Sequence, residues 1–330
     1  METKYLQFNN DDLTLAGELI RQGKLVAFPT ETVYGLGANA LDVEAVKSIY
    51  VAKGRPSDNP LIAHIYTKSQ IYEIAREVSS DAEKIIEYFM PGSITIVLPK
   101  KDVIPDVVTA GLDTVAIRMP RSRQARDFLR YANVPVTAPS ANLSGRPSPT
   151  SWQRVKEDME GRVAAILCGD DCDVGIESTV LDLSTEKPLI LRPGVVTPSQ
   201  IQQVLGKPVE VVTNPKSKVN SPGVRYRHYA PKAPMALDLS GEVTKLTAYY
   251  DGLVQQGYTP VLLVEQPQKY GKRNVCPIGS TDEQVAQRLF ENLRVLEEKY
   301  DYIIASFTSR TSFGQSILNR LVRAAGNNLI

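Results

Sequence analysis

The chain has few of the residues from which metal sites and disulfide frameworks are built. Its 330 residues include two histidines, three cysteines and one tryptophan. His64 and His228 lie far apart, and Cys168, Cys172 and Cys276 form no C-x-x-C pair. We therefore expect neither a disulfide framework nor a Cys/His zinc site. Any metal is expected to be Mg²⁺ that arrives with a substrate, not an ion held by protein side chains.

An excess of one charge and long apolar runs are also missing. The 38 Lys and Arg residues balance 37 Asp and Glu residues, for a net charge of +1, so the chain as a whole is neither polybasic nor polyacidic. No apolar run is long enough to span a membrane, and the opening METKYLQFNN lacks the apolar core of a secretory signal. We expect a cytoplasmic protein that makes no use of a membrane.

Several catalytic and nucleotide-binding motifs are absent as well. No G-x-S-x-G, S-x-x-K, P-loop or kinase signature occurs, which disfavours covalent acyl catalysis. Gly35-x-Gly37-x-x-Ala40 resembles a dinucleotide fingerprint, but Gly35 comes six positions after Pro29 and no helix clearly opens on the glycines. We interpret the segment as a loop after a strand that exposes four polar side chains: Thr30, Glu31, Thr32 and Tyr34.

The length favours two domains, at about 150 residues each. Strand-like and helix-like segments alternate irregularly over 1–208, which predicts one α/β domain with a mixed, twisted sheet. The segment 209–234 begins polar and rich in Pro, Ser and Lys, which is typical of a linker. Over 235–330 the βαβ-type alternation predicts a small parallel sheet. Its helix at 281–299 is expected to open on a capping box formed by Ser280 and Glu283.

Basic and hydroxyl side chains recur where strands are expected to end. Lys53 and Arg55 lie in the stiff loop KGRPSDNP, where two cations suit a polyphosphate. Arg118 lies inside an apolar run and therefore needs an anion. The loop APSANLSGRPSPT carries hydroxyl and amide groups suited to phosphate or ribose. The pattern predicts a site that holds several anions by electrostatics, as transfer to the α-phosphate of ATP requires. Further candidates in this pattern are His64, Ser178 and Arg192.

Seven sequence blocks occur in one order between residues 28 and 194: FPTETVYGLG, KGRPSDNPL, PGSITIVLP, VAIRMP, TAPSANLSG, ESTVLDL and LRPG. This set resembles the YrdC-like family. The downstream SPGVRYRHYAP and the tail that follows it resemble the long, two-domain form of that family. The resemblance implies an N-terminal twisted mixed sheet with helices around a basic cavity, and a smaller Rossmann-like α/β domain at the C-terminus. It also implies that the linker folds across the mouth of the active site.

The resemblance further implies a reaction. ATP, L-threonine and bicarbonate would give threonylcarbamoyl-AMP and pyrophosphate, with Mg²⁺ bound to ATP. The product would serve N6-threonylcarbamoyladenosine formation at position 37 of tRNAs that read ANN codons. The partners implied are a downstream tRNA threonylcarbamoyl-transfer complex and, through the basic cavity, tRNA or other RNA.

Residue roles follow from the same resemblance. The residues implied to act in catalysis are Lys53, Arg55 and Arg118. Those implied to bind L-threonine are Thr32, His64, Arg118, Ala138 and Ser178. Those implied to bind ATP are Lys53, Arg55, Asn59, Thr114, Ser140, Asn142, Ser148, Arg192 and Tyr226. No protein side chain is expected to bind metal.

Two other interpretations remain open at this point. A basic concave surface also suits a non-catalytic protein that binds tRNA or double-stranded RNA. The near-zero net charge and the lack of an RNP-type aromatic motif weigh against that alternative. O-carbamoyl transfer, as in hydrogenase-maturation proteins with a similar domain, is disfavoured because the cysteine clusters of those proteins are missing.

Overall fold

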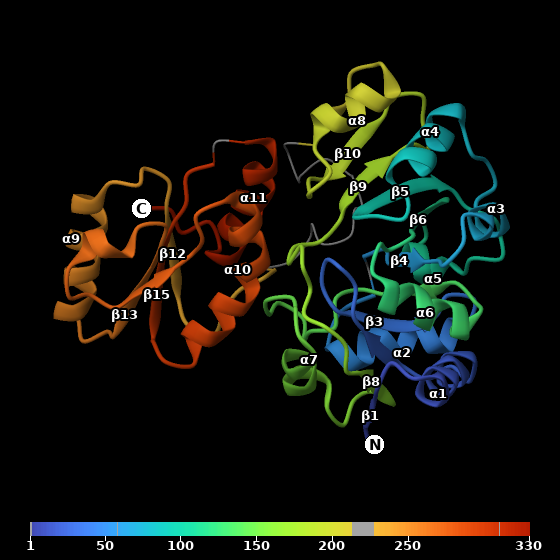
Figure 1. The fold of residues 1–330 in the computed structure, drawn as a ribbon, viewed down its shortest axis with the longest axis horizontal. Helices are drawn as coiled ribbons and strands as arrows, with labels where there is room; N and C mark the ends of the chain where they lie inside the picture. Colours follow the sequence, from blue (N-terminus) through green and yellow to red (C-terminus); the bar gives the residue numbers. More distant parts are fainter. Residues whose placement is uncertain (1, 58, 213–227, 310) are drawn as a thin grey trace. The chain divides into compact units, whose positions relative to one another are not determined.

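Contacts divide the chain into two units, each of which is described by itself (Figure 1). The structure is a computed structural model that describes residues 2–57, 59–212, 228–309 and 311–330. The first unit comprises residues 1–144, 149–173 and 177–225, and the second comprises residues 145–148, 174–176 and 226–330. Two short segments from the N-terminal part of the chain therefore belong, by their contacts, to the second unit.

The first unit is built on an eleven-stranded mixed sheet with the strand order β1-β8-β2-β3-β7-β4-β6-β5-β9-β10-β11. The strands are β1 Lys4–Leu6, β2 Val26–Phe28, β3 Gly35–Asn39, β4 Ile62–His64, β5 Ile94–Pro99, β6 Thr114–Arg118, β7 Val136–Thr137, β8 Ala165–Leu167, β9 Thr179–Asp182, β10 Leu189–Arg192 and β11 Glu210–Val211. The helices are α1 Asn10–Arg21, α2 Val43–Lys53, α3 Ser69–Ile74, α4 Ser80–Phe89, α5 Asp106–Thr109, α6 Arg123–Ala132, α7 Trp152–Met159 and α8 Pro198–Leu205.

Alternating residues of the short central strands face two different cores. On β2, Val26 and Phe28 pack with the apolar residues of α1 and α6, whereas Ala27 packs with α2 on the opposite face. Helix α2 has its boundaries set locally, because the Asp42 carboxylate caps its first turn and Gly54 ends it in the left-handed conformation. Because both faces of the sheet are covered, polar residues at the ends of its strands lie in an enclosed environment.

The segment after β2 differs from its sequence interpretation. Residues 35–39 form strand β3, which pairs antiparallel with β2 and places Gly37 opposite Val26. A Cβ on Gly37 would lie 2.9 Å from a methyl group of Val136, so the glycine is required by packing between strands. The expectation that this segment exposes its polar groups is wrong. The hairpin encloses them, and the exposed fractions are 4% for Thr30, 3% for Glu31, 0% for Thr32 and 0% for Tyr34.

The second unit is a four-stranded, all-parallel sheet with the order β12-β15-β13-β14. Its strands are β12 Met235–Asp238, β13 Pro260–Val264, β14 Val275–Pro277 and β15 Tyr302–Ser306. Its helices are α9 Val243–Gln255, the 3₁₀-helix η1 Pro267–Tyr270, α10 Asp282–Glu297 and α11 Ser312–Ala324. Figure 1 shows α9 on one face of this sheet and α10 and α11 on the other.

Helix α10 begins one residue later than the sequence pattern indicated. Its N-cap is Thr281, whose hydroxyl accepts a hydrogen bond from the Gln284 backbone N–H. The Gln284 side chain in turn accepts hydrogen bonds from the backbone N–H and the hydroxyl of Ser280. The predicted capping box of Ser280 and Glu283 is therefore wrong by one position.

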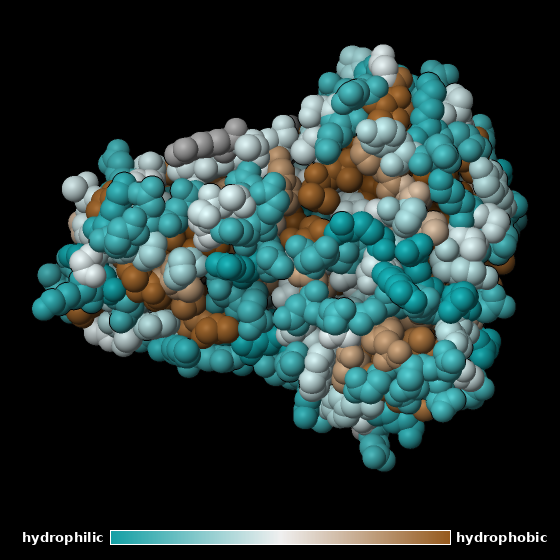
Figure 2. Space-filling view, viewed as in Figure 1, coloured by the Kyte–Doolittle hydropathy of each residue, from teal (hydrophilic) through white to brown (hydrophobic). Residues whose placement is uncertain are grey.

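The predicted fold class is confirmed: a large mixed α/β sheet is followed by a smaller, all-parallel α/β unit. The proposed division at residues 208 and 234 stays a prediction, since β11 extends the first sheet to Val211 and residues 213–227 lie outside the described part. No helix within the described residues is long and apolar enough to cross a bilayer. Figure 2 shows polar residues over much of the viewed face.

Candidate functional site

Arg118 is the centre of the first cluster of predicted site residues. It lies at the end of β6 with a 4% exposed fraction. One terminal nitrogen donates to the Thr32 hydroxyl at 2.8 Å, and the other donates to the Glu31 carboxylate at 2.6 Å. Its Nε is buried and has no hydrogen-bond partner within the described residues. A guanidinium has five N–H donors, so this group retains donors for a ligand carboxylate.

Glu31 is the site residue to which sequence reasoning assigned no role. Its carboxylate also accepts hydrogen bonds from the Ser93 hydroxyl and from the backbone N–H groups of Arg121 and Ser122. Burial alone would raise the pKa of Glu31, but the charge and hydrogen bond of Arg118, with the backbone donors, lower it to about 2. The residue is therefore a carboxylate at neutral pH. A buried arginine 87 positions away was the only sequence signal that an anion was needed.

His64 lies next to Arg118 in the sheet, and Ala138 is hydrogen-bonded to the strand that carries His64. Strand register places His64 directly opposite Arg118, and the Ala138 backbone N–H donates to the Ile62 carbonyl at 2.9 Å. His64 Nδ1 lies 3.1 Å from that same carbonyl. Burial, reinforced by the positive charge of Arg118, lowers the pKa of His64 to about 3. The imidazole is thus neutral at physiological pH and adds no charge to the cluster.

Ser178 and Arg192 form the neighbouring part of the site. The Arg192 side chain donates to the backbone carbonyl of Ser178 at 3.0 Å and to its hydroxyl at 3.1 Å. The Ser178 hydroxyl lies 2.8 Å from that of Thr95 on β5. Ser93 joins this part to the Arg118 cluster, since its hydroxyl donates to Glu31 and its carbonyl accepts from the Thr179 backbone. Of the five residues predicted to bind threonine, Thr32, His64 and Arg118 are therefore direct neighbours, and Ser178 and Ala138 connect to them through adjacent residues.

Lys53 organises the hydroxyl-rich loop that begins at residue 138. At the end of α2, its ammonium donates to the backbone carbonyls of Ser140 at 2.5 Å and Asn142 at 2.6 Å. Its own carbonyl accepts from the Ser144 backbone at 3.0 Å. Lys53 and Asn142 are buried, with exposed fractions of 3% and 5%. The lysine predicted to bind phosphate thus also fixes the backbone of the loop that carries two further ATP candidates.

The next part of that loop belongs to the second unit. Arg294, on α10, has a 1% exposed fraction and donates twice to the Pro147 carbonyl, at 3.2 Å from Nε and 2.7 Å from Nη2. The Arg146 guanidinium pairs with the Glu297 carboxylate on the same helix. These contacts set the path of the chain immediately before Ser148, which is itself 1% exposed.

Three further predicted site residues are placed by contacts of their own backbone, and one lies outside the described part. Thr114 begins β6 opposite Pro99, four residues from Arg118, which is about 13 Å at the rise of a strand. Asn59 is fully buried, and its carbonyl accepts from the Tyr50 hydroxyl at 3.3 Å. Arg55 follows the Gly54 cap of α2, and its backbone N–H donates to the Tyr50 carbonyl at 3.0 Å. Tyr226 lies outside the described residues.

Comparison with known families decides what this arrangement is. Residues 18–194 match the telomere-recombination family of Sua5, YciO and YrdC proteins. Residues 196–326 match the C-terminal domain of threonylcarbamoyl-AMP synthase. The chain belongs to the threonylcarbamoyl-AMP synthase family, in its two-domain form. The predictions of family, fold and enzyme class are thereby confirmed.

Full-length relatives agree with this assignment. The chain is 43% identical to the threonylcarbamoyl-AMP synthase of Bacillus subtilis, with 99% of this chain and 97% of the relative covered. It is 41% identical to that of Pyrococcus abyssi, over 96% of this chain and 95% of the relative. A crystal structure of P. abyssi Sua5 complexed with L-threonine superposes with a TM-score of 0.93 at 39% identity, covering 100% of this chain and 99% of that one.

A more distant structure shares only the fold of the first unit. Escherichia coli YciO superposes with a TM-score of 0.53 at 22% identity, and it covers 59% of this chain and 97% of its own. The two-domain relatives are therefore the ones that bear on the whole chain.

Proposed function

We propose that the chain joins L-threonine, bicarbonate and ATP into threonylcarbamoyl-AMP with release of pyrophosphate, for N6-threonylcarbamoyladenosine in tRNA. The observation that carries this proposal is the buried Arg118, anchored by Glu31 and Thr32, with a further N–H that has no partner within the described residues. A buried donor set of this kind suits an amino-acid carboxylate. Full-length family membership supplies the reaction class.

Threonine is held by the Arg118 cluster in this proposal. The guanidinium binds the carboxylate, and the Thr32 and Ser178 hydroxyls and the Ala138 carbonyl offer partners to the amine and the side-chain hydroxyl. The neutral His64 ring accepts or donates a hydrogen bond without adding a charge. These contacts orient the threonine nitrogen, which is where the carbamate forms with bicarbonate.

The chemical step is a displacement at phosphorus. An oxygen of the carbamate forms a bond to the α-phosphorus of ATP, and the bond from that phosphorus to the oxygen bridging the β-phosphate breaks. The electron pair leaves with pyrophosphate. Lys53, Arg55 and Arg192 are assigned to the phosphates, where fixed cations stabilise the charge that grows on the leaving group. Mg²⁺ bound to the phosphates would add to that neutralisation, and phosphate oxygens are ligands it prefers.

The remaining ATP residues come from four stretches of the chain. Asn59 and the loop carrying Ser140, Asn142 and Ser148 supply amide and hydroxyl groups, and Thr114 adds another hydroxyl. Tyr226, which lies outside the described residues, is assigned to the nucleotide. Replacing Tyr226 with Ala should raise the KM for ATP by about tenfold, the loss of one stacking contact, with little change in the KM for threonine. Equal KM values for wild type and variant would remove the linker from the site.

Arg55→Ala tests the phosphate assignment. It should reduce pyrophosphate release that depends on both threonine and bicarbonate by at least about a hundredfold, since the protein loses a cation that is assigned to the phosphates. Arg76→Ala is the matched control, because Arg76 is an exposed arginine of the same unit. Mass detection of threonylcarbamoyl-AMP identifies the product. An Arg55 variant that turns over normally, with an unchanged circular dichroism spectrum, contradicts the assignment.

The remaining features of the proposal concern partners and compartment. Threonylcarbamoyl-AMP is an activated anhydride, so a tRNA threonylcarbamoyl-transfer complex should take it onward, and a cytoplasmic location would place it beside its tRNA acceptors. A filter-binding assay with tRNA, run beside the pyrophosphate assay, separates this enzyme from the non-catalytic RNA-binding alternative. RNA retention without turnover would favour that alternative.

A further inference from the structure

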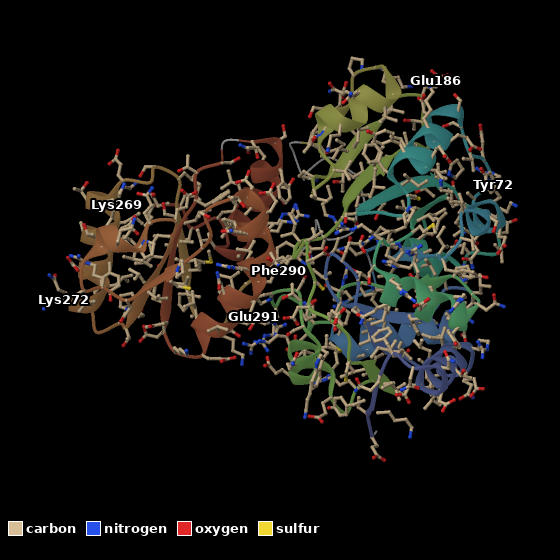
Figure 3. The ribbon with its side chains drawn as sticks, in the orientation of Figure 1. Tyr72, Glu186, Lys269, Lys272, Phe290 and Glu291 are labelled. Carbon is tan, nitrogen blue, oxygen red and sulfur yellow. The ribbon has the colours of Figure 1, made fainter. Side chains whose placement is uncertain are left out.

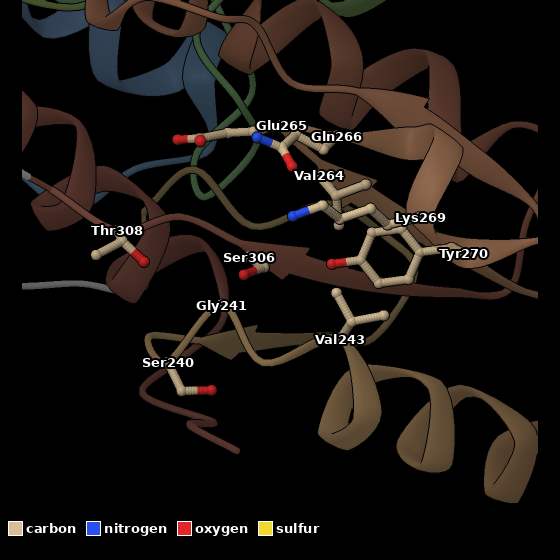
Figure 4. A pocket seen from close by; sticks show the side chains of 10 residues that line it. All are labelled: Ser240, Gly241, Val243, Val264, Glu265, Gln266, Lys269, Tyr270, Ser306 and Thr308. Carbon is tan, nitrogen blue, oxygen red and sulfur yellow. The ribbon is translucent and has the colours of Figure 1, made fainter.

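The second unit contains a cavity of about 230 Å³ at the carboxyl edge of its parallel sheet. The ends of β13 and β15 form its floor, through Val264 and Ser306. The loop after β12 and the 3₁₀-helix η1 form its walls (Figure 4). The threonylcarbamoyl-AMP site proposed above contains no residue of this cavity.

Strand topology explains why a crevice opens at this edge. The chain leaves β12 and β13 toward α9 and η1, which pack together on one face of the sheet. It leaves β15, the strand between them, toward α11 on the opposite face (Figure 1). Connections of neighbouring parallel strands that diverge in this way leave a gap above the strand ends, and open α/β sheets bind ligands at such points. The position of the cavity follows from the strand order.

Two polar side chains, Lys269 and Tyr270, point into this gap. Tyr270 has a 5% exposed fraction, and no hydrogen-bond partner of its hydroxyl lies within the described part of the chain. The Lys269 ammonium pairs with no carboxylate among those same residues. Figure 4 shows the Lys269 and Tyr270 side chains directed from η1 toward Ser306 and Thr308. The ring of Tyr270 is thus fixed by burial, and its hydroxyl is available to donate to a ligand or a water molecule in the cavity.

The nearby carboxylate of Asp238 belongs to the framework of the cavity. It accepts hydrogen bonds from the Ser240 hydroxyl and the Gly241 N–H, both at 2.7 Å, and from the Ser306 hydroxyl at 3.1 Å. Lys245 lies 3.4 Å away and compensates its charge. The Asp238 contacts fix the loop 239–242, and they direct the Ser306 proton away from the gap.

The start of α9 adds a positive field. This helix has 13 residues, and its N-cap Glu242 makes no side-chain hydrogen bond to the first turn. Its leading backbone N–H groups and the dipole therefore favour negative charge near Val243, which lines the cavity. The one acid on the cavity wall, Glu265, points its carboxylate away from Lys269 (Figure 4).

We propose that this cavity is a binding site for the oxyanion of a small metabolite, a phosphate or a carboxylate. Lys269 supplies the charge, the Tyr270 hydroxyl and the first turn of α9 supply directed donors, and Ser306 supplies an acceptor for a polar group next to the anion. The volume of about 230 Å³ is below the ~300–1,000 Å³ of drug-sized sites, which limits the ligand to a single small molecule.

The test is a titration of the full-length, isotope-labelled chain with sodium phosphate and, separately, sodium acetate at constant ionic strength. The amide shifts of Gly241 and Val243 are followed. We expect saturable shifts, with the Kd raised about tenfold by Lys269→Gln, as for loss of a charged hydrogen bond, and several-fold by Tyr270→Phe. Tighter binding of phosphate identifies a phosphoryl group as the ligand group, and tighter binding of acetate identifies a carboxylate.

Two matched controls make the test specific. Lys272 is an exposed lysine three positions from Lys269 (Figure 3), and Lys272→Gln makes the same charge change outside the cavity. Tyr258→Phe removes a tyrosine hydroxyl elsewhere in this unit. Absence of saturable shifts with either anion overturns the proposal, as does a Lys272→Gln effect equal to that of Lys269→Gln. Should Tyr270→Phe fail to fold, the two lysine variants decide the question.

Discussion

Replacing Glu31 with Gln tests whether this carboxylate is the counter-ion that fixes Arg118. The folded-state pKa of Glu31 is about 2, against a reference of 4.5. That difference corresponds to about 3 kcal/mol of preference for the ionised form in the folded state. A glutamine at this position would keep the size of the side chain but leave the buried guanidinium without its anion. We expect the free energy of unfolding to fall by about 2–4 kcal/mol at pH 7.

The pH dependence separates this explanation from a packing defect. The folded-state pKa is depressed, so the wild-type advantage is complete well above pH 4.5 and is lost as the pH falls from 4.5 toward 2. At pH 4 about 0.8 kcal/mol of it should already be gone, because the unfolded carboxyl is then mostly protonated. The Glu31→Gln variant lacks this titration. The difference between the two proteins should therefore shrink in acid.

The assay uses the one tryptophan of the chain, Trp152 on α7. It lies in the first unit with its ring 6.2 Å from that of Tyr5, so its fluorescence reports unfolding of that unit in urea. Glu186→Gln, at an exposed position of the same unit (Figure 3), is the control and should have no measurable effect. A Glu31→Gln loss below about 0.5 kcal/mol, or a loss that stays constant between pH 7 and pH 4, would refute the role of Glu31 as counter-ion.

Two further predictions concern packing and the loop before Ser148. Gly37→Ala should lower the free energy of unfolding by about 1–3 kcal/mol, measured by the same fluorescence, because the new Cβ lies 2.9 Å from Val136; an unchanged stability would contradict the tight strand packing. Arg294→Met removes both donors to the Pro147 carbonyl, and it should raise the KM for ATP about tenfold but leave the KM for threonine nearly constant. Parallel changes in the two KM values would show a general defect in the fold.

Local sequence signals identify best the helices and strands that show both a hydrophobic period and a capping or turn residue at an end. In helix α2 such end signals are present, since Asp42 and Gly54 act as its caps in the structure. Strand β3 was missed because its glycines carry no side chains, and hydrophobic alternation is the signal by which strands are found. The start of α10 was misplaced by one residue because Ser280 and Thr281 are both good N-cap residues.

The sequence likewise predicted one part of the candidate site and missed another. The need of Arg118 for an anion follows from an arginine within an apolar run, but the identity of that anion does not. Glu31 was assigned to an exposed loop, because nothing within a few residues of it indicates burial. Its position depends on the pairing of β2 with β3 and on the place of β6 in the sheet, which are contacts between distant parts of the chain.

The sequence by itself determined the two-part α/β organisation, the family and the residues that recur in its motifs. The hydrophobic period, the turn residues and the ordered motifs that carry this information each depend only on residues close together in the sequence. Only the tertiary structure decided which of those residues meet. It placed Glu31 on Arg118, joined Ser178 to Arg192, and assigned the segment 145–148 to the second unit. Strand order and register bring these groups within hydrogen-bond distance, and the burial of each then requires a partner of opposite charge or matching polarity.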